Sequence, residues 1–202
     1  MQANNWQPVS QNVEARATSI PGLIEFKLDV RGDNRGWFKE NYQREKLVAA
    51  LENIDDPRKS IFLKFNPIQN NFSYNEEKGV ARGIHSEPWD KYISLANGEA
   101  FAAIVDLRQG ETFGKIETFH LTPNNAIFVP QGCGNSYQTL TPNLVYTYLV
   151  NAHWSPDAKY TFVNLRDPDL AIKWPIPLND ALISEKDRNH PLLKDVKPLE
   201  VS

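Results

Sequence analysis

Four side chains of this sequence have the chemistry needed to move protons or to stabilise charge: His85, Lys91, Tyr148 and Asp187. A neutral imidazole is the commonest proton acceptor near pH 7. A phenol such as Tyr148, or Tyr146 on the same strand face, can return a proton, and a lysine can neutralise an oxyanion. Taken singly, each residue is more typical of an ordinary packed or solvated side chain. Their meaning depends on whether the fold brings them together.

Most of the chain carries the hydrophobic period of short β-strands. Residues 23–30 alternate apolar and polar side chains, which is typical of a half-buried strand. A short helix is predicted over 44–51, and Asn97-Gly98 predicts a tight hairpin. Because strands dominate, the sequence predicts an all-β sandwich or barrel. The other predicted strands are 61–65, 80–85, 92–96, 100–107, 115–121, 126–129, 136–140 and 145–150.

The two ends of the chain lack this period. Residues 1–18 are polar, and we expect a loosely held arm there. From residue 166 onward the chain is rich in proline and charge, and we expect it to wrap around the barrel. The full length of 202 residues suits a single domain, and a hydrophobic content of 41% excludes a wholly disordered chain.

Composition excludes several classes of protein. The chain has 25 acidic and 22 basic residues, so no basic surplus favours nucleic acid or an anionic membrane. Cys133 is the one cysteine and cannot form an internal disulfide. The N-terminus lacks the pattern of a signal peptide, and no stretch approaches the ~20 apolar residues of a membrane span. We expect a cytoplasmic protein with no nucleic-acid or membrane partner.

The segment from Gly79 to Asn135 resembles the two motifs of cupins, jelly-roll proteins whose metal-binding members use three or four His or Glu ligands. His85 follows Gly79 by six residues, as in the first motif, but Asn135 stands where the second motif has a histidine. His85 and Glu87 alone are too few ligands for iron, manganese or zinc. We therefore expect no metal. Arg82 points away from the face of His85 unless a glycine between them introduces a bulge.

A longer series of ordered motifs resembles the nucleotide-sugar 3,5-epimerase family typified by dTDP-4-dehydrorhamnose 3,5-epimerase. The series covers about residues 22–193. The resemblance implies a cupin-type jelly-roll barrel with short peripheral helices, without a metal or organic cofactor. It also implies a homodimer that exchanges N-terminal strands. The matching segments are GDNRGWFKE (32–40), QNNFS (69–73), VARGIH (80–85), GEAF (98–101), VDLR (105–108), TFGK (112–115), VPQG (129–132), DPD (167–169), IKWP (172–175) and SEKD (184–187).

The resemblance also implies a reaction and roles for residues. The substrate is a nucleotide-diphospho-4-keto-6-deoxyhexose, whose C4 ketone acidifies the hydrogens at C3 and C5. A base removes one of them to leave an enolate, and an acid on the opposite face returns a proton and inverts the centre. By resemblance His85 is the base, oriented by Asp187, while Tyr148 is the acid and Lys91 lies near the enolate oxygen. The implied substrate-binding residues are Arg35, Glu40, Gln69, Asn71, Arg82 and Asn135.

Two departures from the family concern the reaction itself. The second histidine of the family is Asn135 here, and its aspartate partner is Ala102. An amide can hydrogen-bond a keto or enolate oxygen, but it cannot carry the charge of an imidazolium. We therefore expect inversion at a single centre or a different sugar. dTDP is the first expectation for the nucleotide. CDP and GDP stay open, because Arg31 and His153-Trp154 differ from the family's base-stacking residues. Ser94 also replaces an arginine of the family.

Two other functions remain open from the sequence. A sugar-nucleotide-binding protein that has lost catalysis would explain the changes at Asn135 and Ala102. A 3,4-ketoisomerase of the same fold would also need a base and an enediol. The presence of both a candidate acid and a candidate base favours the epimerase.

Overall fold

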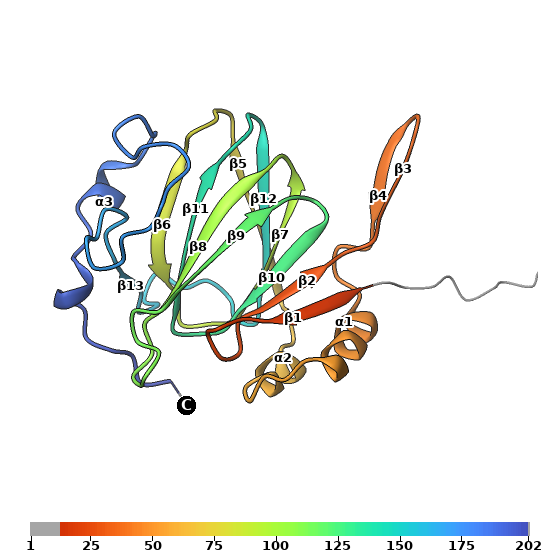
Figure 1. Cartoon of the computed structure of the whole chain (residues 1–202), viewed down its shortest axis with the longest axis horizontal. Helices are drawn as coiled ribbons and strands as arrows, with labels where there is room; N and C mark the ends of the chain where they lie inside the picture. The colour runs from red at the N-terminus through yellow and green to blue at the C-terminus, as the bar shows by residue number, and fades with distance from the viewer. Residues whose placement is uncertain (1–12, 202) are drawn as a thin grey trace, which may run out of the picture.

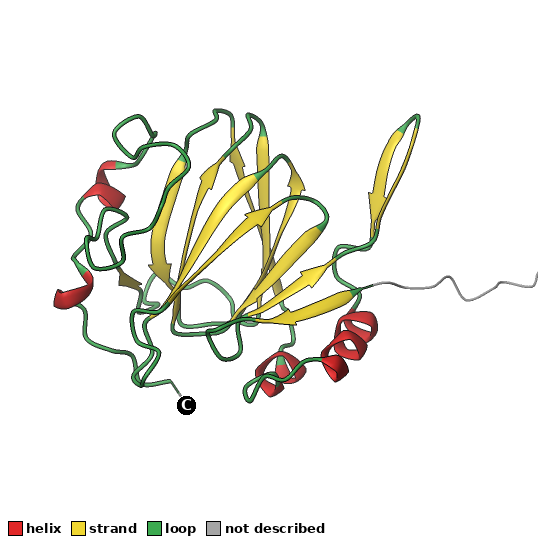
Figure 2. Cartoon of the chain, in the orientation of Figure 1, coloured by secondary structure: helices red, strands yellow, loops and turns green. Residues whose placement is uncertain are grey.

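The strand-forming segments pair into two antiparallel sheets that face each other, as expected for a jelly roll (Figures 1 and 2). The computed structural model describes residues 13–201. The six-stranded sheet has the order β1-β2-β10-β7-β12-β5, the five-stranded sheet has the order β13-β6-β11-β8-β9, and β3 and β4 form a separate hairpin. The strands are β1 (Glu14–Ala17), β2 (Ile24–Lys27), β3 (Val30–Asp33), β4 (Gly36–Lys39), β5 (Gln69–Asn75), β6 (Ala81–Ser86), β7 (Lys91–Asn97), β8 (Ala100–Asp106), β9 (Ile116–Leu121), β10 (Asn125–Val129), β11 (Cys133–Thr139), β12 (Leu144–Val150) and β13 (Thr161–Phe162). The helices are α1 (Arg44–Ala50), η1 (Leu51–Asn53), α2 (Ser60–Lys64), α3 (Glu185–Arg188) and η2 (Leu193–Asp195).

Apolar clusters hold these layers together. One cluster lies between the sheets, where Ile93 of β7 and Ile104 of β8 are fully buried. A second cluster lies on the outer face of the six-stranded sheet, where Leu47 of α1 and Phe62 of α2 pack with Phe128 of β10. The helices therefore form because each has one apolar side that covers a sheet face. Burial of this kind stabilises the fold by roughly 2 kcal/mol for each large side chain.

The C-terminal segment covers the outer face of the five-stranded sheet (Figure 1). Leu165, Leu170 and Leu178 pack in one cluster with Ala81 and Ile84 of β6. The same segment continues into α3, which lies against β6. This packing brings a helix from the end of the sequence next to the strand that carries His85.

The segment 61–65 is a helix, α2, and not the predicted strand. Phe62 and Phe65 are three residues apart and are both fully buried, which is the spacing of one helix face. Their rings pack on Phe128 with centroids 5.1 and 5.2 Å away. A short apolar run has no period that separates helix from strand, so only the packing decides.

Strands also form where the sequence pattern did not indicate them. The predicted polar arm of residues 1–18 falls mostly outside the described residues, but its part Glu14–Ala17 is β1 and pairs with β2. The segment Gln69–Asn75 is β5, although asparagine and glutamine are depleted in strands. Pairing with β12 along its whole length fixes this polar strand.

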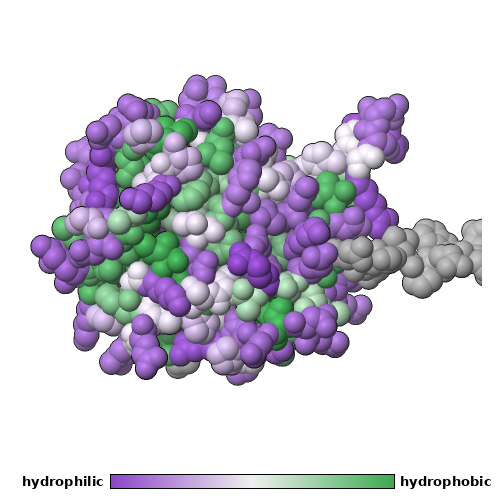
Figure 3. Space-filling model, viewed as in Figure 1, coloured by the Kyte–Doolittle hydropathy of each residue, from purple (hydrophilic) through white to green (hydrophobic). Residues whose placement is uncertain are grey.

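The hairpin of β3 and β4 projects away from the two sheets (Figure 1). Figure 3 shows that its tip is hydrophilic. Nearer the sheets it exposes two aromatic side chains, Trp37 at 47% and Phe38 at 67% of their surface. Large exposed aromatic side chains of this kind are typical of contact with a partner.

Two general properties of the molecule complete the description. Among residues 13–201, no helix is both long and apolar enough to cross a bilayer. Cys133 is buried, and this burial raises the pKa of its thiol far above the usual value. The thiol is therefore neutral and unreactive.

Candidate active site

A register shift in β6 places Arg82 and His85 on one face of the sheet. In the ladder with β11, Arg82 pairs with Tyr137 and His85 pairs with Asn135, so three steps on β6 match two steps on β11. One extra residue of this kind is a β-bulge, which redirects the side chains on either side of it. Gly83 adopts a φ of +121°, and a Cβ there would lie 2.5 Å from a side-chain carbon of β11. Glycine is therefore needed for the bulge that brings both functional side chains together.

His85 and Asp187 form a hydrogen-bonded pair between β6 and α3. The distance from His85 Nε2 to Asp187 Oδ1 is 2.9 Å. Ser184 caps α3 by accepting a hydrogen bond from the Asp187 backbone N–H, at 3.1 Å. Burial alone would raise the pKa of the Asp187 carboxyl. The hydrogen bond and charge of His85, together with the Gly83 backbone N–H and His190, outweigh burial and hold that pKa below its usual value. The ionised carboxylate thus fixes the imidazole and leaves Nδ1 as the nitrogen that can accept a proton.

Lys91 lies in the interior beside Glu87 and Tyr148. Its Nζ is 2.8 Å from Glu87 Oε2, and both side chains are buried. Trp89 donates to the same carboxylate oxygen at 2.6 Å. The Lys91 Nζ also lies 5.5 Å from the centroid of the Tyr148 ring. Burial raises the pKa of Tyr148 to about 12, so this phenol keeps its proton at neutral pH.

Asn135 lies next to His85, on the neighbouring strand of the sheet. Its Oδ1 accepts a hydrogen bond from the Tyr146 hydroxyl at 3.0 Å. The Tyr146 ring stacks on Tyr137, with centroids 4.1 Å apart. Ala102, where the family has a carboxylate, is fully buried and pairs with Tyr137 across the ladder. The partner of Asn135 is therefore a tyrosine hydroxyl and not a charged group.

The inner face of β5 adds polar groups to the same region. Asn71 pairs with Tyr148 in the ladder between β5 and β12. Gln69 Nε2 donates to Asn71 Oδ1 at 2.8 Å. Arg82 Nε donates to Asn75 Oδ1 at 2.9 Å, which links β6 to β5. The structure thus brings Gln69, Asn71 and Arg82 close to the groups that could transfer protons.

Arg35 and Glu40 do not join this cluster within one chain. Arg35 lies at the tip of the projecting hairpin, where it forms an exposed ion pair with Asp33. Glu40 follows the hairpin and is paired with Lys46 of α1. As substrate-binding residues they would need a substrate, or a second chain, on their own side of the molecule.

His190 belongs to the site, although its sequence context did not indicate a role. Its Nε2 lies 3.7 Å from Asp187 Oδ1, and its ring lies edge-on to His85 with centroids 5.4 Å apart. It stacks on Phe162 at 4.6 Å. Burial, with a smaller effect of His85, lowers the pKa of His190. His190 lies two residues after the end of α3, and no sequence motif indicated it.

The donor atoms of His85, Asp187 and His190 lie within 4.8 Å of one another. Two imidazoles and a carboxylate are suitable metal ligands in general. Here His85 Nε2 and Asp187 Oδ1 are hydrogen-bonded to each other at 2.9 Å. The arrangement therefore fits a proton-transfer pair with a neighbouring histidine.

The two facing sheets thus bring a His–Asp pair, a buried lysine and a protonated tyrosine into one region, which is the set of side chains that an isomerase moving protons would need. The chain belongs to the dTDP-4-dehydrorhamnose 3,5-epimerase family, whose sequence profile matches residues 17–195. The RmlC homolog of Streptococcus pyogenes serotype M6 is 50% identical over 90% of this chain and 89% of its own. The dTDP-4-dehydrorhamnose 3,5-epimerase of Pseudomonas aeruginosa is 32% identical over 87% of this chain and 93% of its own.

A solved structure agrees with these similarities. RmlC from Streptococcus suis, in complex with dTDP-D-xylose, superposes with a TM-score of 0.83 at 47% identity, covering 94% of this chain and 96% of the other. Together the comparisons confirm the predicted family, the all-β fold and the predicted class of enzyme, an isomerase of nucleotide sugars. The roles of individual residues stay predictions.

Proposed function

We propose that this protein inverts C3, C5 or both in a dTDP-linked 4-keto-6-deoxyhexose, by removing and returning a proton. The observation that carries the proposal is the His85–Asp187 pair, 2.9 Å apart, in the same region as Tyr148 and Lys91. The dTDP-sugar bound to the similar S. suis protein supports a dTDP-linked substrate. The reaction needs only groups that this chain supplies.

His85 is the base of the proposed reaction. It takes the proton from the carbon next to the ketone through Nδ1, and Asp187 stabilises the imidazolium that forms. Because the pKa of Asp187 is held below its usual value, the carboxylate is charged at the pH of the reaction. The electrons of the broken C–H bond move into the enolate, whose oxygen becomes negative.

Lys91 and Tyr148 act on that enolate. A lysine ammonium beside the oxygen stabilises the developing negative charge. The buried ion pair with Glu87 keeps the Lys91 side chain in one place. Tyr148 then donates its proton to the opposite face of the carbon, which inverts the centre. Because its pKa is raised to about 12, the phenol carries its proton at neutral pH, which supports the role of donor.

The environment of Asn135 supports inversion at a single centre. Tyr146 donates to its oxygen, so the amide nitrogen is left to donate to a substrate oxygen. Neither Asn135 nor the buried Ala102 can share a proton with a substrate carbon. The second proton-transfer pair that the family resemblance implies is therefore replaced by a hydrogen-bonding group.

A second copy of the chain would give Arg35 and Glu40 a site to act on. The hairpin carries Arg35 on an extension that exposes Trp37 and Phe38. We therefore propose a homodimer in which each hairpin contacts the partner's substrate. The cytoplasmic location expected from the sequence stays a prediction.

The direct test is proton NMR in deuterium oxide with dTDP-4-keto-6-deoxyglucose, and with the CDP- and GDP-linked sugars in parallel. We expect loss of the C3 or the C5 signal with the dTDP-sugar. Exchange at both carbons would show that Asn135 does not restrict the reaction. Binding without exchange for all three sugars would instead indicate a sugar-nucleotide-binding protein, and movement of the ketone to C3 would indicate a ketoisomerase.

Two variants assign the acid and the base in the same assay. His85→Asn should slow exchange by about 10²–10⁴-fold, the usual contribution of a general base. Tyr148→Phe should keep exchange with solvent but lose inversion. Normal inversion by Tyr148→Phe would place the acid elsewhere, with Tyr146 as the next candidate.

A further inference from the structure

A cleft of about 420 Å³ lies where several strands of the six-stranded sheet begin or end, and Asp90 of its lining directly precedes Lys91. Asp90 precedes β7, Gln131 follows β10 and Asn151 follows β12, and all three line this cleft. None of the residues proposed to bind the sugar nucleotide or to transfer protons is in its lining. Its chemistry must therefore be judged separately.

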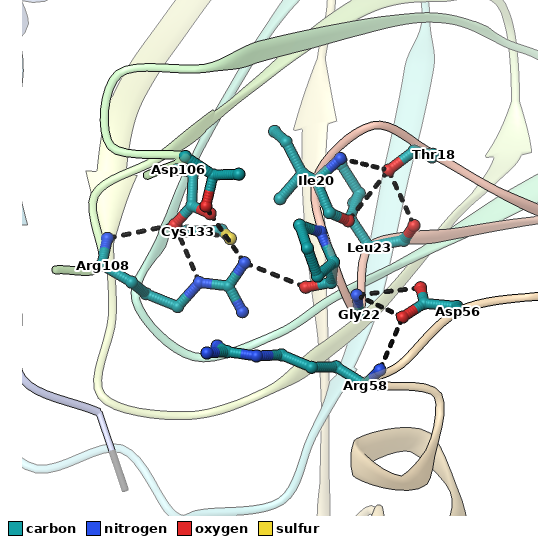
Figure 4. Close-up of polar contacts among 11 residues, drawn as sticks. Thr18, Ile20, Gly22, Leu23, Asp56, Arg58, Asp106, Arg108 and Cys133 are labelled. Atoms are coloured by element: carbon teal, nitrogen blue, oxygen red, sulfur yellow. Dashed lines mark hydrogen bonds and ion pairs between the residues drawn. The ribbon is translucent and has the colours of Figure 1, made fainter. Parts of the chain in front are cut away.

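Arg108 lines the cleft with two N–H groups that have no acceptor. A guanidinium has five N–H donors. Nε and Nη2 donate to the two oxygens of Asp106 at 2.8 and 2.7 Å, and Nη2 also donates to the Pro21 carbonyl at 2.9 Å (Figure 4). Nη1 is buried and has no hydrogen-bond partner among residues 13–201. The side chain is 95% buried, so these unused donors are costly unless an acceptor reaches them.

Two more cations lie at the rim of the same cleft. Arg58 precedes α2 and Lys64 is its last residue. The backbone N–H of Arg58 donates to Asp56 Oδ1 at 2.7 Å, which anchors this corner. Figure 4 shows the Arg58 side chain extending toward the region of Arg108. Neither rim cation forms an ion pair within the described part of the chain.

The one carboxylate of the lining is already occupied. Asp90 accepts from the backbone of Gln131 at 2.8 Å and from the Asn151 amide at 2.8 Å. Asp106 is likewise neutralised by Arg108. The lining of the cleft thus carries three cationic side chains, those of Arg58, Lys64 and Arg108, and the single carboxylate of Asp90.

We propose that this cleft binds a tetrahedral oxyanion, the phosphate dianion or the phosphate group of a small metabolite. Arginine presents several N–H donors in a plane that matches phosphate oxygens, and lysine adds a point charge. A bound phosphate would be held at the rim by Arg58 and Lys64, with the guanidinium of Arg108 in the wall behind it. The protein would then carry an anion site separate from the sugar-nucleotide site.

Calorimetric titration of the full chain with inorganic phosphate at pH 8 tests this site. Arg58→Gln and Lys64→Gln change exposed rim residues, so both variants should fold normally. Each should weaken phosphate binding about tenfold, because each removes one charged contact. Lys78→Gln removes an exposed lysine elsewhere and should bind phosphate like the wild type. Arg82→Gln, in the candidate active site, should also retain this binding.

The other outcomes are as informative. Glycerol 3-phosphate that binds more tightly than phosphate would identify a phosphorylated metabolite as the ligand, and equal binding would identify free phosphate. Loss of phosphate binding in Arg82→Gln, with normal binding in Arg58→Gln, would overturn the proposal, as would no saturable binding at all.

Discussion

Two histidines share one carboxylate in the candidate site. His85 forms a hydrogen bond with Asp187, whereas His190 lies 3.7 Å from the same oxygen, beyond the range of a good bond. His190 instead packs between Phe162 and His85. A charged imidazole in that position would compete with His85 for Asp187. The buried, neutral state of His190 therefore keeps the carboxylate available to the proposed base.

This arrangement predicts how stability depends on pH. Because the pKa of His190 is lowered in the folded protein, the unfolded chain binds a proton as pH falls through about 6.5 and the folded protein does not. The free energy of unfolding should therefore decrease as the pH is lowered from about 6.5 to the pKa of His190 in the folded protein. His190→Phe, which keeps a stacked ring, should show a smaller loss of Tm between pH 7.5 and pH 5.5 than the wild type.

His120→Gln is the control for that measurement, because His120 is an exposed histidine paired with Glu99. Asp187 also has a lowered pKa, but its contribution is lost only below about pH 4, outside the measured range. An unchanged pH dependence in His190→Phe would mean that His190 titrates normally in the folded protein.

At the scale of elements, β6 is the part of the fold on which the site depends most. Its bulge sets the directions of Arg82 and His85, and α3 packs on its outer side with Asp187. Gly83 connects the two, since its backbone N–H donates to Asp187 Oδ2 at 3.3 Å. A change in this strand would disturb the base, its carboxylate and the substrate-binding arginine together.

Gly83→Ala should therefore impair both stability and activity. An added Cβ would lie 2.5 Å from Ser136 and would force a positive φ on alanine, for an expected cost of about 3 kcal/mol or more. Gly79→Ala is the matched control, with a φ of +86° but no atom nearer than 3.6 Å to the new Cβ, and should cost about 1 kcal/mol. Urea unfolding measures both, and equal losses would contradict this account.

The sequence predicts the central strands and the family of the protein well, and the polar strands poorly. β7, β8 and β12 are short, largely apolar runs that are mostly buried, which is the pattern that indicates a core strand. β5 has no such run, because its inner face carries the amides of Gln69, Asn71 and Asn75. The pairing of His85 with Asp187 spans 102 residues, so spacing alone cannot reveal it, and only the family resemblance indicated it. His190 carried no motif and was found only through packing.

At the scale of the whole molecule, the hairpin of β3 and β4 is the part least explained by a single chain. It contributes little to the apolar clusters, yet it carries Arg35 and exposes Trp37 and Phe38. None of the residues 30–39 belongs to an apolar cluster, so the hairpin does not add to the packing of the sheets. Contact with a second copy would bury the aromatic side chains and place Arg35 at the partner's site.

Mixed dimers test this arrangement. His85→Asn and Arg35→Gln chains are each expected to be nearly inactive alone. If the hairpin completes the partner's site, each mixed dimer has one site with both wild-type residues. Random pairing makes half of the dimers mixed, so co-expression should restore about a quarter of wild-type activity. No recovery in dimers shown to be mixed would mean that each chain uses its own Arg35.

The buried thiol of Cys133 has a practical consequence for following that hairpin. Because the sequence has no other cysteine and this one is neutral and enclosed, maleimide dyes should leave the native protein unlabelled. A cysteine introduced by Asn34→Cys at the hairpin tip would then take up a single fluorophore. Energy transfer between two such labels would report the separation of the tips, and its change when a sugar nucleotide enters, without any background from the rest of the chain.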